Sequence, residues 1–378
     1  MSTHAERVAA AADFDAARAI RLLSDLMTPR MAVYWTDLCL SALAGWSAFG
    51  AVVVLTPRTP WAALLLLPAA VAMYRATLFI HELVHFRRRE HRSRFGLGWN
   101  VLVGFWLLIP YFMYEGHSEH HSRRLYGTAG DAEYVAFARM SRSEMVKMAL
   151  SALVLPLFGP VRFGVLAPVS WLVPRTREWV YARASTIKID VEYRGHPPKR
   201  SQRTRWLVQE AVCFVLVWAV LGLVLTGVLS PVVLLWWLAL MVGVAGLDTA
   251  RLLGAHRYLG NDSEANLVLQ MIDTINYPRS RVAGLVWGPV GLRLHALHHL
   301  VPSLPYHAYR EAHHRLVTQL PAGSAYHLTE SPGLLHSIAE LWRAPRPTEQ
   351  AEPAPTAAHQ PGGASTGRSS GSRPAAPR

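Results

Sequence analysis

The chain has 378 residues, of which 51% are hydrophobic and 17% charged, and it carries a formal net charge of +13. The hydrophobic residues stand in blocks of about 20, the length that crosses a bilayer, which excludes an ordinary water-soluble enzyme. The basic residues flank these blocks, as they do in membrane proteins that face anionic lipid, so the charge does not indicate a nucleic-acid partner.

The first part of the chain predicts a surface segment followed by a membrane hairpin. Residues 1–30 contain four acidic residues and no apolar core of a signal peptide, which predicts an amphipathic segment. The first predicted span covers residues 32–55, and a turn with two prolines separates it from a second span at 61–80. Cys39 in the first span and Cys213 further along lie in apolar surroundings, which predicts packed thiols rather than a disulfide or a zinc site.

Two further apolar stretches are interrupted by glycine or proline. Residues 95–114 contain three glycines and a proline, so an interfacial or re-entrant segment is expected there rather than a span. Residues 145–173 contain three prolines and are expected to associate with the membrane too. Two strong spans follow at 206–226 and 232–253, which completes four transmembrane helices in two hairpins.

The distribution of basic residues predicts the orientation. Residues 87–94 contain five arginines and residues 175–205 nine lysines or arginines, whereas the two hairpin turns contain only Arg58. The positive-inside rule therefore places both termini and the polar segments in the cytoplasm. The predicted fold class is all-α, with a polytopic membrane domain over residues 31–343 and a cytoplasmic histidine-rich cap. Residues 344–378, rich in Pro, Ala, Gly and Ser, are expected to form a disordered tail.

The residues that carry chemistry are histidines, of which the chain has 18. Three clusters have the i, i+3 or i+4 spacing that places imidazoles on one face of a helix, and one more histidine directly follows the last span. Because the second and fourth spans end on the cytoplasmic side, these side chains are expected to converge above the bundle. The nine candidate ligands are His81, His85, His117, His120, His121, His256, His295, His298 and His299.

Nine imidazoles predict two metal ions. Neutral imidazole suits iron, zinc, copper and nickel, and nine ligands exceed what one of these ions takes. A redox-inactive pair would support hydrolysis, whereas two irons with open positions would bind and split O2, and the spacing leaves both open. Residues 81–85, H-E-L-V-H, also match the zinc-protease motif H-E-x-x-H with Glu82 as general base, but that alternative leaves the other clusters unexplained. Transport is disfavoured because the histidines lie at span ends rather than at mid-bilayer.

The three clusters, with these intervals and spans, resemble the histidine boxes of the membrane fatty acid desaturase and hydroxylase superfamily over residues 30–320. The resemblance extends to residues 251–258, where His256 is similar to the family's additional metal-binding histidine, and to residues 126–134 after the second box. It implies a cytoplasmic diiron site, with the nine histidines as ligands and O2 as co-substrate. It also implies an external electron donor of the ferredoxin or cytochrome b5 type.

The resemblance implies an O2-dependent oxidation of a C–H bond, which can give either a double bond or a hydroxyl group. The first expectation is a fatty acyl desaturase acting on phospholipid, acyl-carrier-protein or coenzyme A esters. The alternative is a hydroxylase or ketolase of lipids, carotenoids or secondary metabolites. Either enzyme is expected in the bacterial inner membrane.

Several residues depart from the family's pattern or have roles of their own. Residues 195–198, Gly-His-Pro-Pro, are not the His-Pro-Gly-Gly of a fused cytochrome b5 domain, so a separate donor is implied. The family's asparagine four residues before the additional histidine is Leu252 here, and Asp248 is a substitute candidate. Glu82 and Glu119 are expected to orient imidazole N–H groups. Interfacial anchoring, rather than a substrate channel, is expected for the aromatic residues Trp99, Trp106, Tyr111, Tyr114 and Trp287.

Overall fold

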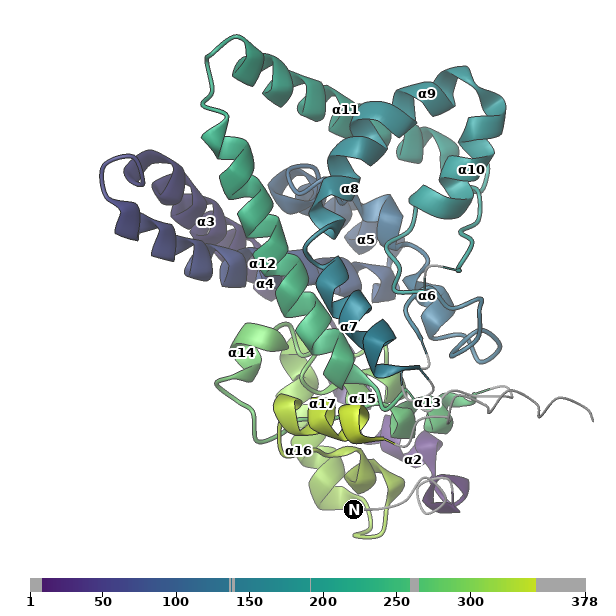
Figure 1. The fold of residues 1–378 in the computed structure, drawn as a ribbon. Helices are drawn as coiled ribbons and strands as arrows, with labels where there is room; N and C mark the ends of the chain where they lie inside the picture. Colours follow the sequence, from purple (N-terminus) through teal and green to yellow (C-terminus); the bar gives the residue numbers. More distant parts are fainter. Residues whose placement is uncertain (1–8, 136, 138–139, 191, 259–264, 345–378) are drawn as a thin grey trace, which may run out of the picture.

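The computed structural model describes residues 9–135, 137, 140–190, 192–258 and 265–344. In this part of the chain the predicted all-α fold is confirmed: the regular elements are helices, and only isolated bridges join extended residues. Figure 1 shows long helices that spread from one end of the molecule and a group of short helices packed at the other end. The disordered tail predicted for residues 344–378 lies, beyond Ala344, outside the described residues.

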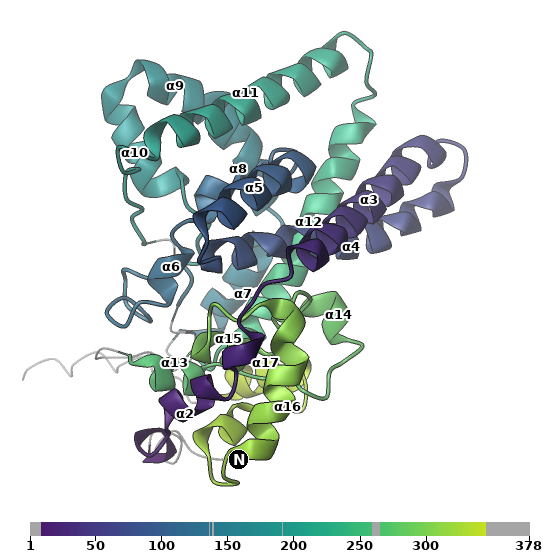
Figure 2. The ribbon, with the colours of Figure 1, turned by 180° about the vertical axis from the view of Figure 1, so that it is seen from behind.

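Two long helical hairpins form the apolar part of the molecule. The first joins α3 (Met31–Leu55) to η2 (Pro60–Leu65) and α4 (Leu66–His85), and the second joins α11 (Arg203–Leu225) to α12 (Val232–Ala255). Both turns lie where the sequence predicts them. Helix α4 packs against both α3 and α12, so the two hairpins meet along α4 (Figures 1 and 2).

Five helices are long and apolar enough to cross a membrane, whereas the sequence predicts four spans. The fifth runs from Leu155 to Leu172 and combines α8 (Leu155–Val161), a π-helical turn (Arg162–Leu166) and α9 (Ala167–Leu172). Pro156 occupies the first turn of α8, where no backbone N–H is needed, whereas Pro160 lies inside α8 and Pro168 follows the π-helical turn. The stretch is thus divided into segments, as its prolines predict, and it is also long and apolar enough to be a fifth candidate span.

The stretch 95–114 is divided into short helices. It contains the end of α5 (Arg89–Trp99), a π-helical turn (Asn100–Gly104) and the 3-10 helix η4 (Tyr111–Tyr114). Among the described residues, no helix in this stretch meets the length and apolarity of a membrane span. The polar segments after it contain α6 (His117–His120), α7 (Arg142–Ser151) and α10 (Pro174–Ala184).

The short helices at the other end pack around an apolar core of their own. Buried side chains such as Leu297, Leu316 and Tyr326 form this core, and Ala19 and Leu23 of the N-terminal segment pack into it. Figure 2 shows this group, which we call the cap, below the ends of α4 and α12. The cap helices are α2 (Ala16–Arg21), η1 (Ser24–Leu26), α13 (Leu267–Asp273), α14 (Gly284–Trp287), α15 (His295–Leu300), η7 (Tyr306–Ala308), α16 (Tyr309–Gln319), η8 (Ala325–Thr329) and α17 (Leu334–Arg343).

The two cysteines differ in their surroundings. Both are free thiols; Cys213 is buried, as predicted, but Cys39 is exposed on the surface of α3. The prediction of a packed thiol was wrong for Cys39, because an apolar stretch of sequence does not show which face of a lipid-facing helix is covered by protein.

Candidate metal centre

The first two ligand candidates lie on the last turn of α4. His81 and His85 are four residues apart, so both project from the same face of this helix. The helix stops there because Phe86 adopts an extended backbone conformation (φ −62°, ψ 118°). Their ring centroids are 5.2 Å apart.

The second and third boxes lie on two very short helices, which are held by side chains around them. Helix α6 carries His117 and His120 and ends at His121. Helix α15 begins at His295, and the Asn276 side chain accepts hydrogen bonds from the backbone N–H groups of Ala296 and Leu297 at 3.0 and 3.2 Å. A side-chain oxygen at this place satisfies N–H groups that a helix cannot bond internally, so Asn276 fixes the start of the third box.

The structure brings all nine predicted histidines together in two adjoining groups. Within each group the candidate ligand nitrogens lie within 4.8 Å of one another, and all nine side chains are buried or half-buried. The second and third boxes each contribute to both groups, so the groups share their supporting helices. The first group is His81, His85, His117, His121 and His298, and the second is His120, His256, His295 and His299.

The distances inside the groups fit metal ligation. The Nε2 atoms of His121 and His298 are 3.0 Å apart, and those of His256 and His295 are 3.1 Å apart. Nitrogens about 2.1 Å from one ion and at right angles to each other would be separated by about 3 Å. Both pairs therefore have the spacing expected of two ligands on one ion.

Unpartnered nitrogens independently favour a metal site here. Both ring nitrogens of His81 and of His299 are buried and lack a hydrogen-bond partner among the described residues, and so does Nε2 of His85. A buried polar atom without a partner costs free energy, so such atoms are rare in folded proteins. A metal ion would be the missing partner of one nitrogen on each of these rings.

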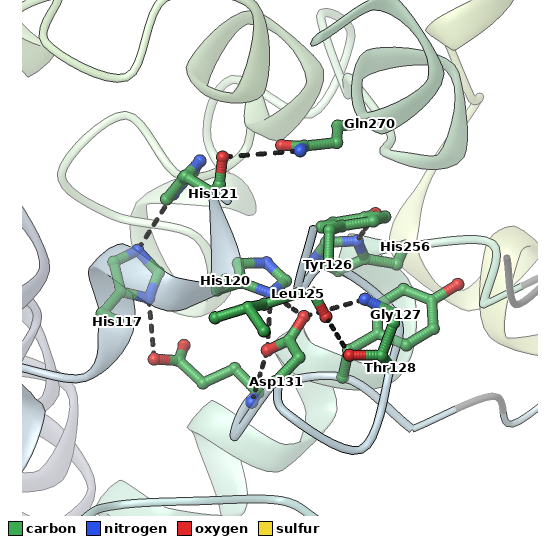
Figure 3. Close-up of polar contacts among 12 residues, drawn as sticks. His117, His120, His121, Leu125, Tyr126, Gly127, Thr128, Asp131, His256 and Gln270 are labelled. Atoms are coloured by element: carbon green, nitrogen blue, oxygen red, sulfur yellow. Dashed lines mark hydrogen bonds and ion pairs between the residues drawn. The ribbon is translucent and has the colours of Figure 1, made fainter. Parts of the chain in front are cut away.

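Carboxylates and tyrosines orient the rings from behind. His117 Nδ1–H donates to Glu133 at 2.7 Å. Figure 3 shows the second contact, in which His120 Nδ1–H donates to Asp131 at 2.9 Å. The third box has a tyrosine in this role, since His298 Nδ1 lies 3.0 Å from the Tyr309 hydroxyl. A Nδ1–H that is bonded in this way leaves Nε2 free to bind a metal.

A relay through a tyrosine orients His256. Its Nδ1 lies 3.0 Å from the Tyr126 hydroxyl, which in turn donates to Asp273 at 2.7 Å. Tyr134 donates to the same carboxylate oxygen at 2.9 Å. Sequence reasoning missed Asp273, whose position depends on the antiparallel bridge that pairs His256 with Thr274.

The surroundings of these histidines keep most of their imidazole rings neutral, which is the form that binds a metal. Burial, together with the neighbouring imidazoles, lowers the pKa of His121, His295, His298 and His299 well below the usual range. For His120, burial lowers the pKa, but the charge and hydrogen bond of Asp131 outweigh this and raise it. Neutral imidazole is the form that binds a metal, so the burial of these groups favours ligation at neutral pH.

The two glutamates that were expected to orient histidines bond elsewhere. Glu82 accepts hydrogen bonds from the Tyr34 hydroxyl at 2.6 Å and the Tyr306 N–H at 3.2 Å, and its other oxygen is 4.0 Å from His81, too far for a hydrogen bond. Glu119 accepts from the Tyr193 hydroxyl at 2.7 Å. Both predictions were wrong, and the position of Glu82 also disfavours its use as the general base of a zinc protease.

Other predicted roles are corrected by burial and contacts. Asp248 is outside both groups and forms an ion pair with Arg251 at 2.9 Å, so it does not replace the family's asparagine as a ligand. Trp99, Tyr111 and Tyr114 are buried in the core around α4 and are not interfacial anchors. Tyr114 instead stacks on His117, with ring centroids 4.9 Å apart, and donates to Glu133.

A cavity of about 230 Å³ reaches the first group from outside. His85 and Glu82 lie at its inner wall, and Arg87, Arg88 and His91 lie nearer the surface. A small molecule could approach His85 by this route, while the four histidines of the second group are all buried.

Replacing Asp273 with asparagine is expected to weaken the second metal site without unfolding the protein. The amide keeps the size of the carboxylate but loses its charge, and loss of such a supporting partner typically costs about 10–100-fold in metal affinity. Competition with a chelator, followed by metal analysis, measures this effect. Glu119→Gln is the matched control, because Glu119 bonds a tyrosine that orients no histidine, and an equal loss in both variants would contradict the role of Asp273.

Comparisons with known proteins agree with this geometry. The sequence model described as "Fatty acid desaturase" matches residues 59–330. A protein named ceramide hydroxylase from Caulobacter vibrioides (strain NA1000 / CB15N) is 38% identical over 330 residues, which cover 86% of this chain and 92% of the relative. No solved structure matches the chain.

Proposed function

Because this chain belongs to the fatty acid desaturase family, we propose that it is an O2-dependent membrane hydroxylase of an amide-linked lipid of the ceramide type. The observation that carries the proposal is the pair of adjoining histidine groups, which fit two ions in one buried site. The relative that is a ceramide hydroxylase favours hydroxylation over the desaturation that the sequence suggested first.

The proposed reaction converts a C–H bond into a C–O–H bond. One oxygen atom of O2 enters the lipid and the other leaves as water, which consumes two electrons from an external donor and two protons. Two irons at the nine histidines would supply the activation of O2 and the oxidation of the C–H bond.

The residues of the chain have three tasks in this reaction. The histidines hold the ions, while Asp131, Glu133 and Asp273 hold the rings in the ligand orientation. The burial of the site excludes water, and the membrane helices bring an apolar substrate to its edge. The basic residues that flank the spans support an orientation in which the site and both termini face the cytoplasm of a bacterial inner membrane.

Mass spectrometry of lipids separates the two outcomes. We expect cells that express the protein and are supplied with ceramide to accumulate ceramide with one added oxygen atom, which carries the heavy isotope when heavy-isotope O2 is supplied. A product lacking two hydrogen atoms would identify a desaturase instead. His120→Ala is the control, and a product that persists in this variant would refute the proposed site.

A further inference from the structure

A partly exposed carboxylate lies within the last turns of the membrane-spanning helix α12. The Asp248 side chain is 36% exposed, whereas that of its partner Arg251 is 7% exposed. Arg251 donates to Oδ1 of Asp248 through Nε at 3.1 Å and through Nη2 at 2.9 Å. An ionised group at membrane depth is costly and usually serves a function. This pair therefore either binds a substrate or stabilises the fold.

Only one oxygen of Asp248 is used inside the protein. In the described part of the chain, the hydrogen bonds that Arg251 donates to this carboxylate both go to Oδ1, and the Tyr74 hydroxyl oxygen lies 3.5 Å from the same atom. Oδ2 is therefore left to accept a hydrogen bond from outside. A purely structural partner of Arg251 would be expected to use both oxygens in a bidentate pair, as Asp37 does with Arg75.

Three elements meet at this carboxylate. The Tyr74 hydroxyl of α4 donates to the backbone carbonyl of Trp287 in α14 at 3.1 Å, and α14 packs against α12 (Figure 1). Leu285 of α14 is 60% exposed, and Val282, just before this helix, is 81% exposed. Apolar side chains exposed beside spanning helices fit the acyl chains of a lipid.

The junction lies close to the histidine groups along both helices. Tyr74 is seven residues before His81, a rise of about 10 Å in α4, and Arg251 is five residues before His256, a rise of about 7 Å in α12. A lipid bound at Asp248 would thus lie beside the proposed metals.

We propose that Asp248, held by Arg251, accepts a hydrogen bond from the amide N–H or a hydroxyl of the lipid substrate, which enters from the membrane at the junction of α4, α12 and α14. This proposal rests on the proposed function and specifies how that site recognises its substrate. A carboxylate oxygen distinguishes an amide-linked lipid, which has an N–H donor, from an ester-linked lipid, which has none at that place.

Lipid retention in native mass spectrometry tests the recognition apart from catalysis. The iron-loaded protein is purified with equal amounts of ceramide and an acetylated diacylglycerol of matched chain lengths, which has neither an N–H nor a hydroxyl. We expect wild type to retain ceramide in preference, and the double variant Asp248→Leu/Arg251→Met, which leaves no unpaired charge, to lose that preference by about tenfold. Asp248→Glu should keep it, and a lost preference in Asp248→Glu would contradict the role of the carboxylate.

Further outcomes separate this proposal from the proposed function. A double variant that keeps its iron and its preference for ceramide would overturn the role of Asp248, and so would a wild-type protein that does not prefer ceramide. If the double variant does not fold, Asp248→Ala/Arg251→Gln provides the same comparison, because it also removes the carboxylate and leaves no unpaired charge. A wild type that retains ceramide through Asp248 but never oxidises it would overturn the hydroxylase function and leave the recognition site intact.

Discussion

Replacing His85 with alanine is expected to lower the iron content from about two ions per chain to about one, and replacing His256 should do the same by emptying the other position. His85 belongs to the group of five imidazoles and His256 to the group of four. Because each ion depends on its own group, either variant should lose at least about 100-fold in turnover, more than the loss of a supporting partner costs. The double variant should contain almost no iron.

Metal analysis of the purified protein and product formation from ceramide measure the two effects in the same samples. His307→Ala is the control, because His307 lies outside both groups and accepts a hydrogen bond from the Arg30 N–H at 3.0 Å. It should retain both ions. Retention of two irons in His85→Ala would contradict the division into two groups, and stoichiometric zinc without iron in the wild type would contradict an iron-dependent oxidase.

The sequence alone predicts the positions of the ligands but not their division. Apolar blocks fix where α4 and α12 end, and the positions of His85 and His256 follow from those ends. The division depends on how short helices are rotated: His120 lies with His256, while its neighbour His121 lies with His85. No periodicity in a four-residue helix shows that rotation, because contacts with the rest of the fold determine it.

The supporting residues were harder to predict for a related reason. Glu82 and Glu119 are adjacent to box histidines in the chain, yet adjacent residues on a helix point in different directions. Asp131 and Glu133 reach the rings through the turn after α6, which includes the left-handed residue Gly127 (φ +73°). Asp273 is brought to His256 because the segment around Thr274 pairs with His256. The same segment brings Asn276 to the start of the third box. Such pairings leave no local signal in one sequence.

The second large effect is expected at a buried ion network far from the histidines. Glu210 of α11 is fully buried and pairs with Arg162, which is also fully buried, and with Arg177 at 2.6 Å. Trp171 donates to the same carboxylate at 3.4 Å. These contacts tie the fifth candidate span and α10 to α11, so the network determines how that side of the helix bundle assembles.

Replacing Glu210 with alanine should lower the free energy of unfolding by about 3–5 kcal/mol, because it leaves two arginines without their counter-charge in an apolar interior. Thermal unfolding in detergent measures the loss. Glu90→Ala is the matched control: its pair with Arg94 is exposed on both sides and contributes at most about 1 kcal/mol. The triple variant Arg162→Met/Arg177→Met/Glu210→Leu should recover most of the stability, since apolar residues of similar volume often replace a buried ion network without cost. If the triple variant is as unstable as Glu210→Ala, the loss comes from altered packing rather than from unpaired charge.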